Sequence, residues 1–148
     1  MKTPGVKKTA EELMIDNKPI DAKRRTVYRS CTMRCSYICP GRPDIVYSVK
    51  ELAKNMQEPK EYDWTALKRL GRFLVGKPRL IQAFEEQPPQ NVIKVLTDSD
   101  QSGDLMTRRS TSGFVAMCGK HSLKHGSNSQ PVPKMSSGEA EYSGVVKG

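Results

Sequence analysis

Hydrophobic residues recur with a helical period through the first half of this chain. The spacing predicts three helices, from Ala22 to Tyr37, from Pro43 and Asp44 onward, and from about Tyr62 to Val75. The apolar positions expected on one side of each are Val27, Cys31, Met33 and Cys35 in the first helix, Ile45, Val49, Leu52 and Met56 in the second, and Leu67, Leu70, Phe73 and Leu74 in the third. Trp64 is expected to pack in the core beside them.

The second half of the chain has the shorter period of β-strands. Strands are predicted from Arg79 to Phe84, from Val92 through Leu96, from Thr111 to Cys118 and from His121 to Ser127. Gly119 and Lys120 form a predicted hairpin turn, and a last helix begins near Ser136. Residues 1–21 lack sustained periodicity and are expected to be a linker. The pattern predicts an α+β fold, with a helical N-terminal segment, antiparallel strands and one further helix.

The basic charge of the chain is concentrated in its first half. Of the formal net charge of +9, residues 1–80 contribute 18 lysines and arginines against 9 acidic residues. A basic flank beside acidic residues suits a nucleic-acid enzyme, and a solvated basic surface explains the same charge equally well. No stretch is long and apolar enough to span a membrane, and the N-terminus lacks the apolar core of a signal peptide. We therefore expect an intracellular protein, not a secreted one, with no membrane partner.

Three cysteines, Cys31, Cys35 and Cys39, are spaced four residues apart. Zinc sites use closer pairs with a second pair elsewhere, and no such second pair is present. On a helix the spacing places all three thiols along one side, where reduced cysteines behave as small hydrophobic residues. The sequence therefore favours a packing role.

Acidic and basic side chains mark the candidate functional positions. The strand that starts at Val92 delivers Asp98 to its C-terminal end, and Asp100 and Asp104 after it are typical turn residues. Near the C-terminus, Ser136 and Glu139 have the spacing of a helix capping box, whereas Glu141 points about 200° away from Glu139 around the helix axis. The candidate phosphate-binding residues are Lys68, Arg69 and Arg72 on the third helix, and Arg108 and Arg109 in the loop before the strand predicted from Thr111 to Cys118.

Three motifs give the chain a family resemblance. TDSDQSGD, RRSTSGFVAMCG and SSGEAEY, in this order and spacing, resemble the ribonuclease H region of copia-type retrotransposon Pol polyproteins. Upstream, TVYRSCTMRCSYICPGRPDIVYSVKELAKNM and DWTALKRLGRFLVGKPR resemble the segment that connects the reverse transcriptase to ribonuclease H in the same polyproteins. The resemblance implies a linker at residues 1–21, a helical reverse transcriptase connection at 22–78, and a truncated ribonuclease H-like domain at 79–148 with an incomplete mixed sheet.

The resemblance also implies a chemistry. Ribonuclease H hydrolyses the RNA of RNA–DNA hybrids with two divalent ions, Mg²⁺ or Mn²⁺, about 4 Å apart. In this sequence Asp98 and Glu141 match the family's catalytic, metal-binding positions, which leaves Glu139 for the helix cap. The later acids of the family are absent before Gly148, and the sequence departs from the family at Gln101, Gly126, Pro131, Pro133 and Lys134.

Three functional hypotheses follow from the resemblance and the charge. The chain is a piece of a retrotransposon polyprotein whose lineage activity is hybrid hydrolysis and which is itself expected to be inactive. Alternatively, it is a basic nucleic-acid-binding remnant without catalysis, or a non-functional fragment. Its expected partners are an RNA–DNA hybrid or another nucleic acid and the remainder of the polyprotein. The open edge of the sheet is expected to favour aggregation or pairing with that missing segment.

Overall fold

The computed structural model describes residues 3–5, 18–104 and 107–147. The chain divides into two compact units, residues 1–80 and 81–148. Most of the expected linker, residues 6–17, lies outside the described residues.

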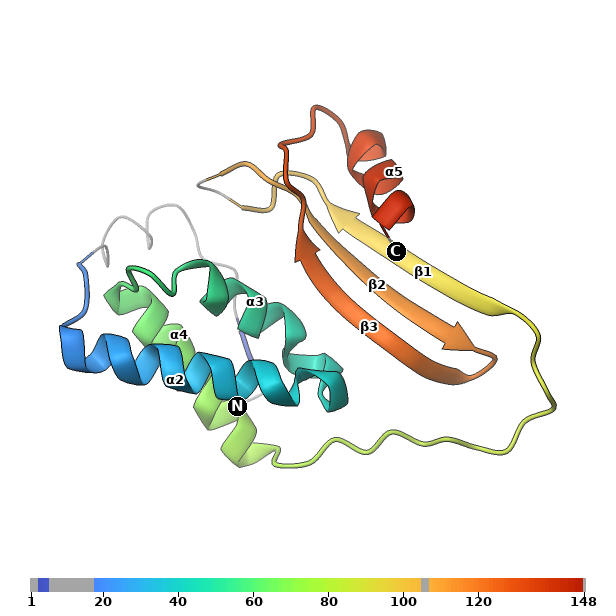
Figure 1. The fold of residues 1–148 in the computed structure, drawn as a ribbon, viewed down its shortest axis with the longest axis horizontal. Helices are drawn as coiled ribbons and strands as arrows, with labels where there is room; N and C mark the ends of the chain where they lie inside the picture. Colours follow the sequence, from blue (N-terminus) through green and yellow to red (C-terminus); the bar gives the residue numbers. More distant parts are fainter. Residues whose placement is uncertain (1–2, 6–17, 105–106, 148) are drawn as a thin grey trace. The chain divides into compact units, whose positions relative to one another are not determined.

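The first unit contains the three predicted helices (Figure 1). They are α2 (Ala22–Ile38), α3 (Val46–Lys54) and α4 (Glu61–Gly76), with short 3₁₀ turns at Cys39–Gly41 and Pro43–Ile45 between α2 and α3. Helix α2 begins where the sequence predicted because the Asp21 carboxylate accepts a hydrogen bond from the Arg24 backbone N–H at 2.6 Å. Helix α3 begins three residues later than predicted, because Pro43 starts a 3₁₀ turn instead of the α-helix itself.

The core of the first unit is formed by one face of each helix. The buried hydrophobic residues are Ile20, Tyr28, Ile45, Val49, Leu52, Leu67, Leu70 and Phe73. The predicted stripes of α3 and α4 are confirmed, and Trp64 packs against this core. In α2 the expectation for Val27 and Met33 was wrong, since both are exposed. Tyr28 and Thr32 are buried in their place, in line with the half-buried cysteines.

The cysteines of α2 behave as packing residues. Cys31, Cys35 and Cys39 are free thiols, partly buried against the core of the first unit. Burial raises the pKa of the Cys35 and Cys39 thiols above its ordinary value. A protonated thiol is a poor nucleophile and a poor metal ligand, which agrees with the hydrophobic role expected from their spacing.

The second unit is a three-stranded antiparallel sheet with one helix packed on it (Figure 1). Its strands are β1 (Ile93–Asp100), β2 (Thr111–Cys118) and β3 (His121–Ser129), in the order β1-β2-β3, and α5 (Ser137–Lys147) packs on β1 and β2. Gly119 opens the predicted turn between β2 and β3 with a positive φ of 57°. The α+β fold expected from the sequence is thus confirmed.

The strand predicted from Arg79 to Phe84 is not formed. Ile81 is 90% exposed and Phe84 is also exposed, so this segment lacks the neighbouring strand that would satisfy its backbone. Beyond it, the Gln87 amide Nε2 donates to the Cys118 carbonyl at 2.9 Å. Side chains, rather than strand pairing, therefore hold this part of the connection to the sheet.

Candidate functional site

Asp98 lies on the face of the sheet opposite α5. A Cβ atom placed on Gly144 of α5 would lie 3.5 Å from Ser112 Oγ, so Ser112 points toward that helix. Ser112 pairs directly with Ser99 of β1. Directly paired residues share a face of a sheet and consecutive residues alternate between faces. Ser99 therefore faces α5, and Asp98, which is exposed, faces away from it.

Glu141 lies on the exposed side of α5. Ala140 and Gly144 are the buried residues of this helix, whereas Glu141 is exposed. Asp98 and Glu141 thus belong to different layers of the second unit, and the sheet face that carries Asp98 is not the face that α5 covers. Within residues 18–104 and 107–147, no group of three or more His, Cys, Asp or Glu side chains is arranged to hold a metal ion.

Glu139 has a local structural role at the start of α5. Its backbone N–H donates to Ser136 Oγ at 3.2 Å, which is one half of the predicted capping box. Its carboxylate accepts a hydrogen bond from the Met135 N–H at 3.1 Å, instead of from the Ser136 N–H, and one from Lys134 Nζ at 3.2 Å. These donors, the Met135 N–H first, lower the pKa of Glu139. Glu139 is therefore engaged at the start of α5, and the metal-binding role expected for Glu141 stays a prediction.

Asp100 and Asp104 hold the connection between β1 and β2. Asp100 Oδ1 accepts a hydrogen bond from the Thr111 N–H across the mouth of the loop. Asp104 Oδ1 accepts one from the Thr107 N–H at 3.1 Å. Both residues therefore act in the turn, as the sequence indicated. Arg108, with a φ of 56°, and Arg109 are exposed in the same loop.

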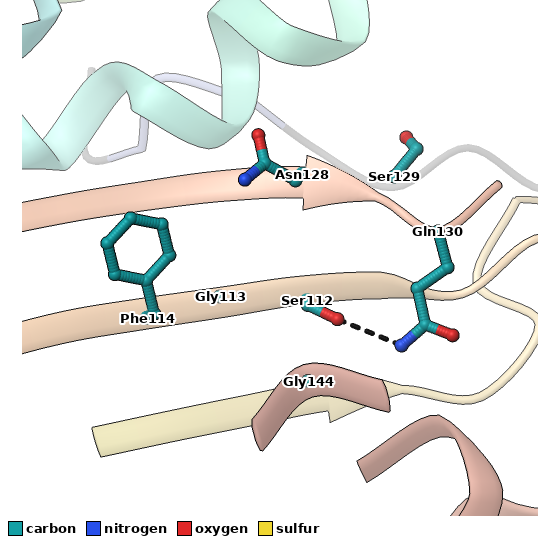
Figure 2. Close-up of a pocket in the computed structure, with 7 residues that line it drawn as sticks. All are labelled: Ser112, Gly113, Phe114, Asn128, Ser129, Gln130 and Gly144. Carbon is teal, nitrogen blue, oxygen red and sulfur yellow. Dashed lines mark hydrogen bonds between the residues drawn. The ribbon is translucent and has the colours of Figure 1, made fainter. Parts of the chain in front are cut away.

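A buried glutamine connects α5 to the sheet, and sequence reasoning missed it. Gln130 is only 2% exposed, and its Nε2 donates to Ser112 Oγ at 2.9 Å (Figure 2). The same Nε2 also donates to the Ala140 carbonyl at 2.8 Å. Its Oε1 is buried without a hydrogen-bond partner in the described part of the chain. The residues around it line a small cavity formed by Ser112, Gly113, Phe114, Asn128, Ser129, Gln130 and Gly144. A glutamine after the last strand has no pattern that would have revealed this contact.

The candidate cations of α4 separate into two groups. Lys68 and Arg72 are exposed and lie four residues apart, on one side of the helix. Neither makes an ion pair with any acid in the described ranges. Arg69 is half-buried, and its Nη2 donates to Thr3 Oγ1 at 3.0 Å. The exposed pair Lys68 and Arg72 remains available to a phosphate.

Helix α2 carries a second group of exposed cations. Lys23 and Arg34 are eleven residues apart, which places them on the same side of the helix. Tyr37, three residues after Arg34, is 87% exposed on that side. Like Lys68 and Arg72, these two cations have no acidic partner in the part of the first unit that the structure describes. By contrast, Arg24 is neutralised by Glu61 at 3.0 Å.

None of the helices in the described ranges has the length and apolar character needed to cross a lipid bilayer.

The chain is similar to proteins of transposable elements. It is 33% identical over 121 residues to the retrovirus-related Pol polyprotein from transposon RE2 of Arabidopsis thaliana, a match that covers 82% of this chain and 8% of the polyprotein. The counterpart from transposon RE1 of the same plant is 34% identical with the same coverage. An uncharacterized mitochondrial protein of Arabidopsis thaliana is 34% identical over 115 residues, 78% of this chain and 48% of that protein.

The chain thus spans about 8% of the length of the Pol polyproteins that it matches. No family model and no solved structure matches it. Over most of its length the chain is a distant homologue of copia-type Pol polyproteins.

Proposed function

We propose that this chain is a segment of a retrotransposon Pol polyprotein of the reverse transcriptase and ribonuclease H type, and that it binds nucleic acid through its helical unit. The ligand class is the RNA–DNA hybrid on which that lineage acts. The single observation that carries the proposal is that α2 and α4 carry exposed cations that no described acid neutralises, among them Lys23, Arg34, Lys68 and Arg72.

The arrangement of these cations suits a phosphate backbone. Lys23 and Arg34 are separated by about 16 Å along α2, at 1.5 Å per residue, so that they reach well-separated phosphates of one strand. Tyr37 on the same side of α2 offers an exposed ring on which a base can stack. Contacts of this kind favour nucleic acid over other anions without reading its sequence.

The proposal assigns binding, and not hydrolysis, to this chain. Two-metal hydrolysis needs several carboxylates that converge on the same Mg²⁺ or Mn²⁺ ions. Asp98 faces away from α5, which carries Glu141, so the two candidate ligands do not fit a shared pair of ions in this arrangement. The family roles of Asp98 and Glu141 therefore stay a prediction.

The binding proposal is tested with the full chain and a fluorescently labelled RNA–DNA hybrid, by anisotropy at several salt concentrations. Changing Lys68 and Arg72 together to glutamine removes two phosphate contacts. The negative slope of log K against log salt concentration should then become less steep by about 1.4 to 1.8. The matched control changes Lys120 and Lys124 of the second unit to glutamine, with the same loss of net charge. Equal losses in both double variants, or binding that salt does not weaken, would contradict the proposal.

The same hybrid tests the assignment of binding without cleavage. The chain is incubated with the hybrid in Mg²⁺ or Mn²⁺ beside the Asp98→Asn and Glu141→Gln variants. We expect the RNA strand to remain intact in all three samples. Cleavage by the parent chain that both substitutions abolish would show that the two carboxylates act together, and would replace this proposal with an active ribonuclease H.

A further inference from the structure

Side chains hold the segment that precedes β1 against the turn between β2 and β3. Gln87 is the central contact: its Oε1 accepts from the Lys120 N–H and its Nε2 donates to the Cys118 carbonyl, both at 2.9 Å. A Cβ atom on Gly119 would collide with Gln87 Oε1, so the amide can approach the turn only because residue 119 is glycine. The two backbone groups fix the orientation of the amide, because an N–H can only donate and a carbonyl can only accept.

His121, the first residue of β3, contacts the same segment. Its Nε2 lies 2.7 Å from the Glu85 carbonyl oxygen, and its Nδ1 lies 3.2 Å from Gln87 Nε2. The Phe84 ring packs on the imidazole at an angle of 63°, with 5.3 Å between the ring centroids. These contacts connect residues 84–87, which we call the strap, to the turn.

The hydrogen bonds around His121 require a neutral imidazole. Its Nε2 must carry a hydrogen, because the Glu85 carbonyl can only accept. Its Nδ1 must carry none, because Gln87 Nε2 can only donate to it. Gln87 cannot turn its amide over to offer an acceptor, since its Nε2 would then face the Lys120 N–H and its Oε1 the Cys118 carbonyl. The docked strap therefore fits only one protonation state of His121.

The charges around the imidazole do not relieve this requirement. The Glu85 carboxylate is the acid of the strap that lies nearest in the chain to the bonded carbonyl, and Lys120 Nζ lies 3.5 Å from it. Both side chains are at least 70% exposed, so that water screens a pair whose charges already offset each other. Glu86 is exposed as well. Cys118, the cross-strand neighbour of His121, carries a thiol, a group that is ordinarily uncharged in mildly acidic solution.

We propose that the strap is docked on the turn while His121 is neutral and is released when His121 takes up a second proton. Protonation places a hydrogen on Nδ1, which then faces the hydrogens of Gln87 Nε2. A hydrogen bond is thereby replaced by a repulsive contact between two donors. Histidine side chains ordinarily become protonated near about pH 6.5, so mildly acidic solution favours release. The loss of one net hydrogen bond should raise the ratio of released to docked strap by up to about tenfold.

Release of the strap changes the connection between the two units. Helix α4 ends at Gly76 and β1 begins at Ile93, and the strap lies between them. When the strap is docked, the turn of the second unit holds part of this connection. When the strap is released, a longer stretch of the connection is no longer held by the sheet. This inference rests on the turn and the strap alone, and not on the nucleic-acid-binding function proposed for the helical unit.

NMR spectroscopy of the full chain tests the proposal from about pH 8 to about pH 5, the range in which histidine titrates. The Lys120 amide signal reports on docking, because this N–H donates to Gln87 Oε1. The Gln87→Ala variant lacks the docking amide and gives the position of this signal in the released state. Its own pH dependence gives the direct effect of the imidazole charge on the signal. As the pH falls, we expect the parent signal to move toward its position in Gln87→Ala, and the nuclear Overhauser effects between the Phe84 and His121 rings to weaken.

His125, the other histidine of the chain, provides the matched control. His125→Gln should retain the pH dependence of the Lys120 signal, whereas His121→Gln should remove it, because glutamine does not titrate in this range. A parent signal that changes with pH no more than in Gln87→Ala overturns the proposal. So does a pH dependence that His121→Gln retains, or ring contacts between Phe84 and His121 that keep their full intensity at about pH 5. The amide signals of β1 and β2 show whether each variant retains the sheet.

Discussion

Tyr28 provides a sensitive test of how the helical unit is held together. It is fully buried, and its hydroxyl donates to the Leu52 carbonyl of α3 at 2.7 Å. That carbonyl otherwise receives only a long hydrogen bond, 3.4 Å, from the Asn55 N–H beyond the end of α3. Tyr28→Phe keeps the ring and removes the donor, so the carbonyl remains buried with one weak partner. We expect the free energy of unfolding to fall by about 1 to 2 kcal/mol.

The assay for this prediction is urea unfolding followed by tryptophan fluorescence. Trp64 is the only tryptophan and packs against the core of the first unit, so its emission reports on that unit. The matched control is Tyr37→Phe, which removes the same hydroxyl from a ring that is 87% exposed and should change stability by less than about 0.5 kcal/mol. If the two variants unfold at the same urea concentration, the hydroxyl of Tyr28 does not stabilise α3 and the argument fails.

The same residue predicts a pH dependence. Burial is the main cause that raises the pKa of Tyr28, with a further contribution from the charge of Asp63. The folded state therefore holds the proton more tightly than the unfolded state, in which the pKa is about 10. The stability that this provides is fully present below pH 10 and is lost as the pH rises above it. Tyr28→Phe should make the urea midpoint less dependent on pH in that range, and an unchanged dependence would contradict this assignment.

Two further predictions concern the second unit. A Cβ on Gly126 would lie 2.4 Å from the Phe114 ring, so Gly126→Ala should destabilise the sheet by about 1 to 3 kcal/mol. The control is Gly113→Ala, which should not destabilise the sheet because the nearest atom to its Cβ lies 3.9 Å away. Hydrogen exchange of the β2 and β3 amides distinguishes the two variants. Glu139→Gln should speed amide exchange in the first turn of α5, and Glu141→Gln should not, because only Glu139 bonds the Met135 N–H. Because the pKa of Glu139 is lowered, the stabilisation from its carboxylate is fully present above the ordinary glutamate pKa. The difference in amide exchange between the Glu139→Gln and Glu141→Gln variants should therefore disappear as the pH falls through the lowered pKa of Glu139. A difference that persists in acid would contradict the capping role of Glu139.

The sequence predicted those features of the fold that local pattern determines. The three helices and the strand from Thr111 to Cys118 follow from periodicity and from Pro or Gly at the ends. The strand expected at Arg79 to Phe84 was wrong because a strand also needs a neighbour, and no local pattern supplies one. Val27 and Met33 were misplaced for a related reason. Which side of α2 is buried depends on the ring of Tyr28 reaching α3, a contact between distant residues.

Contacts between distant residues also limited what the sequence could predict about the candidate site. The sequence predicted that Glu139 acts at the start of α5, since a capping box is a local pattern, but it could not show which face of the sheet α5 would cover. That choice depends on Gln130, which bonds both Ser112 and the Ala140 carbonyl of α5.

The register of β1 makes the position of Asp98 difficult to change. Moving Asp98 to the face that α5 covers would require a slip of one residue, which would turn every side chain of β1 to the other face. All eight pairs with β2 oppose such a slip, and so does the turn bond from the Thr111 N–H to Asp100. Any metal site that uses Asp98 must therefore draw its other ligands from the sheet face opposite α5.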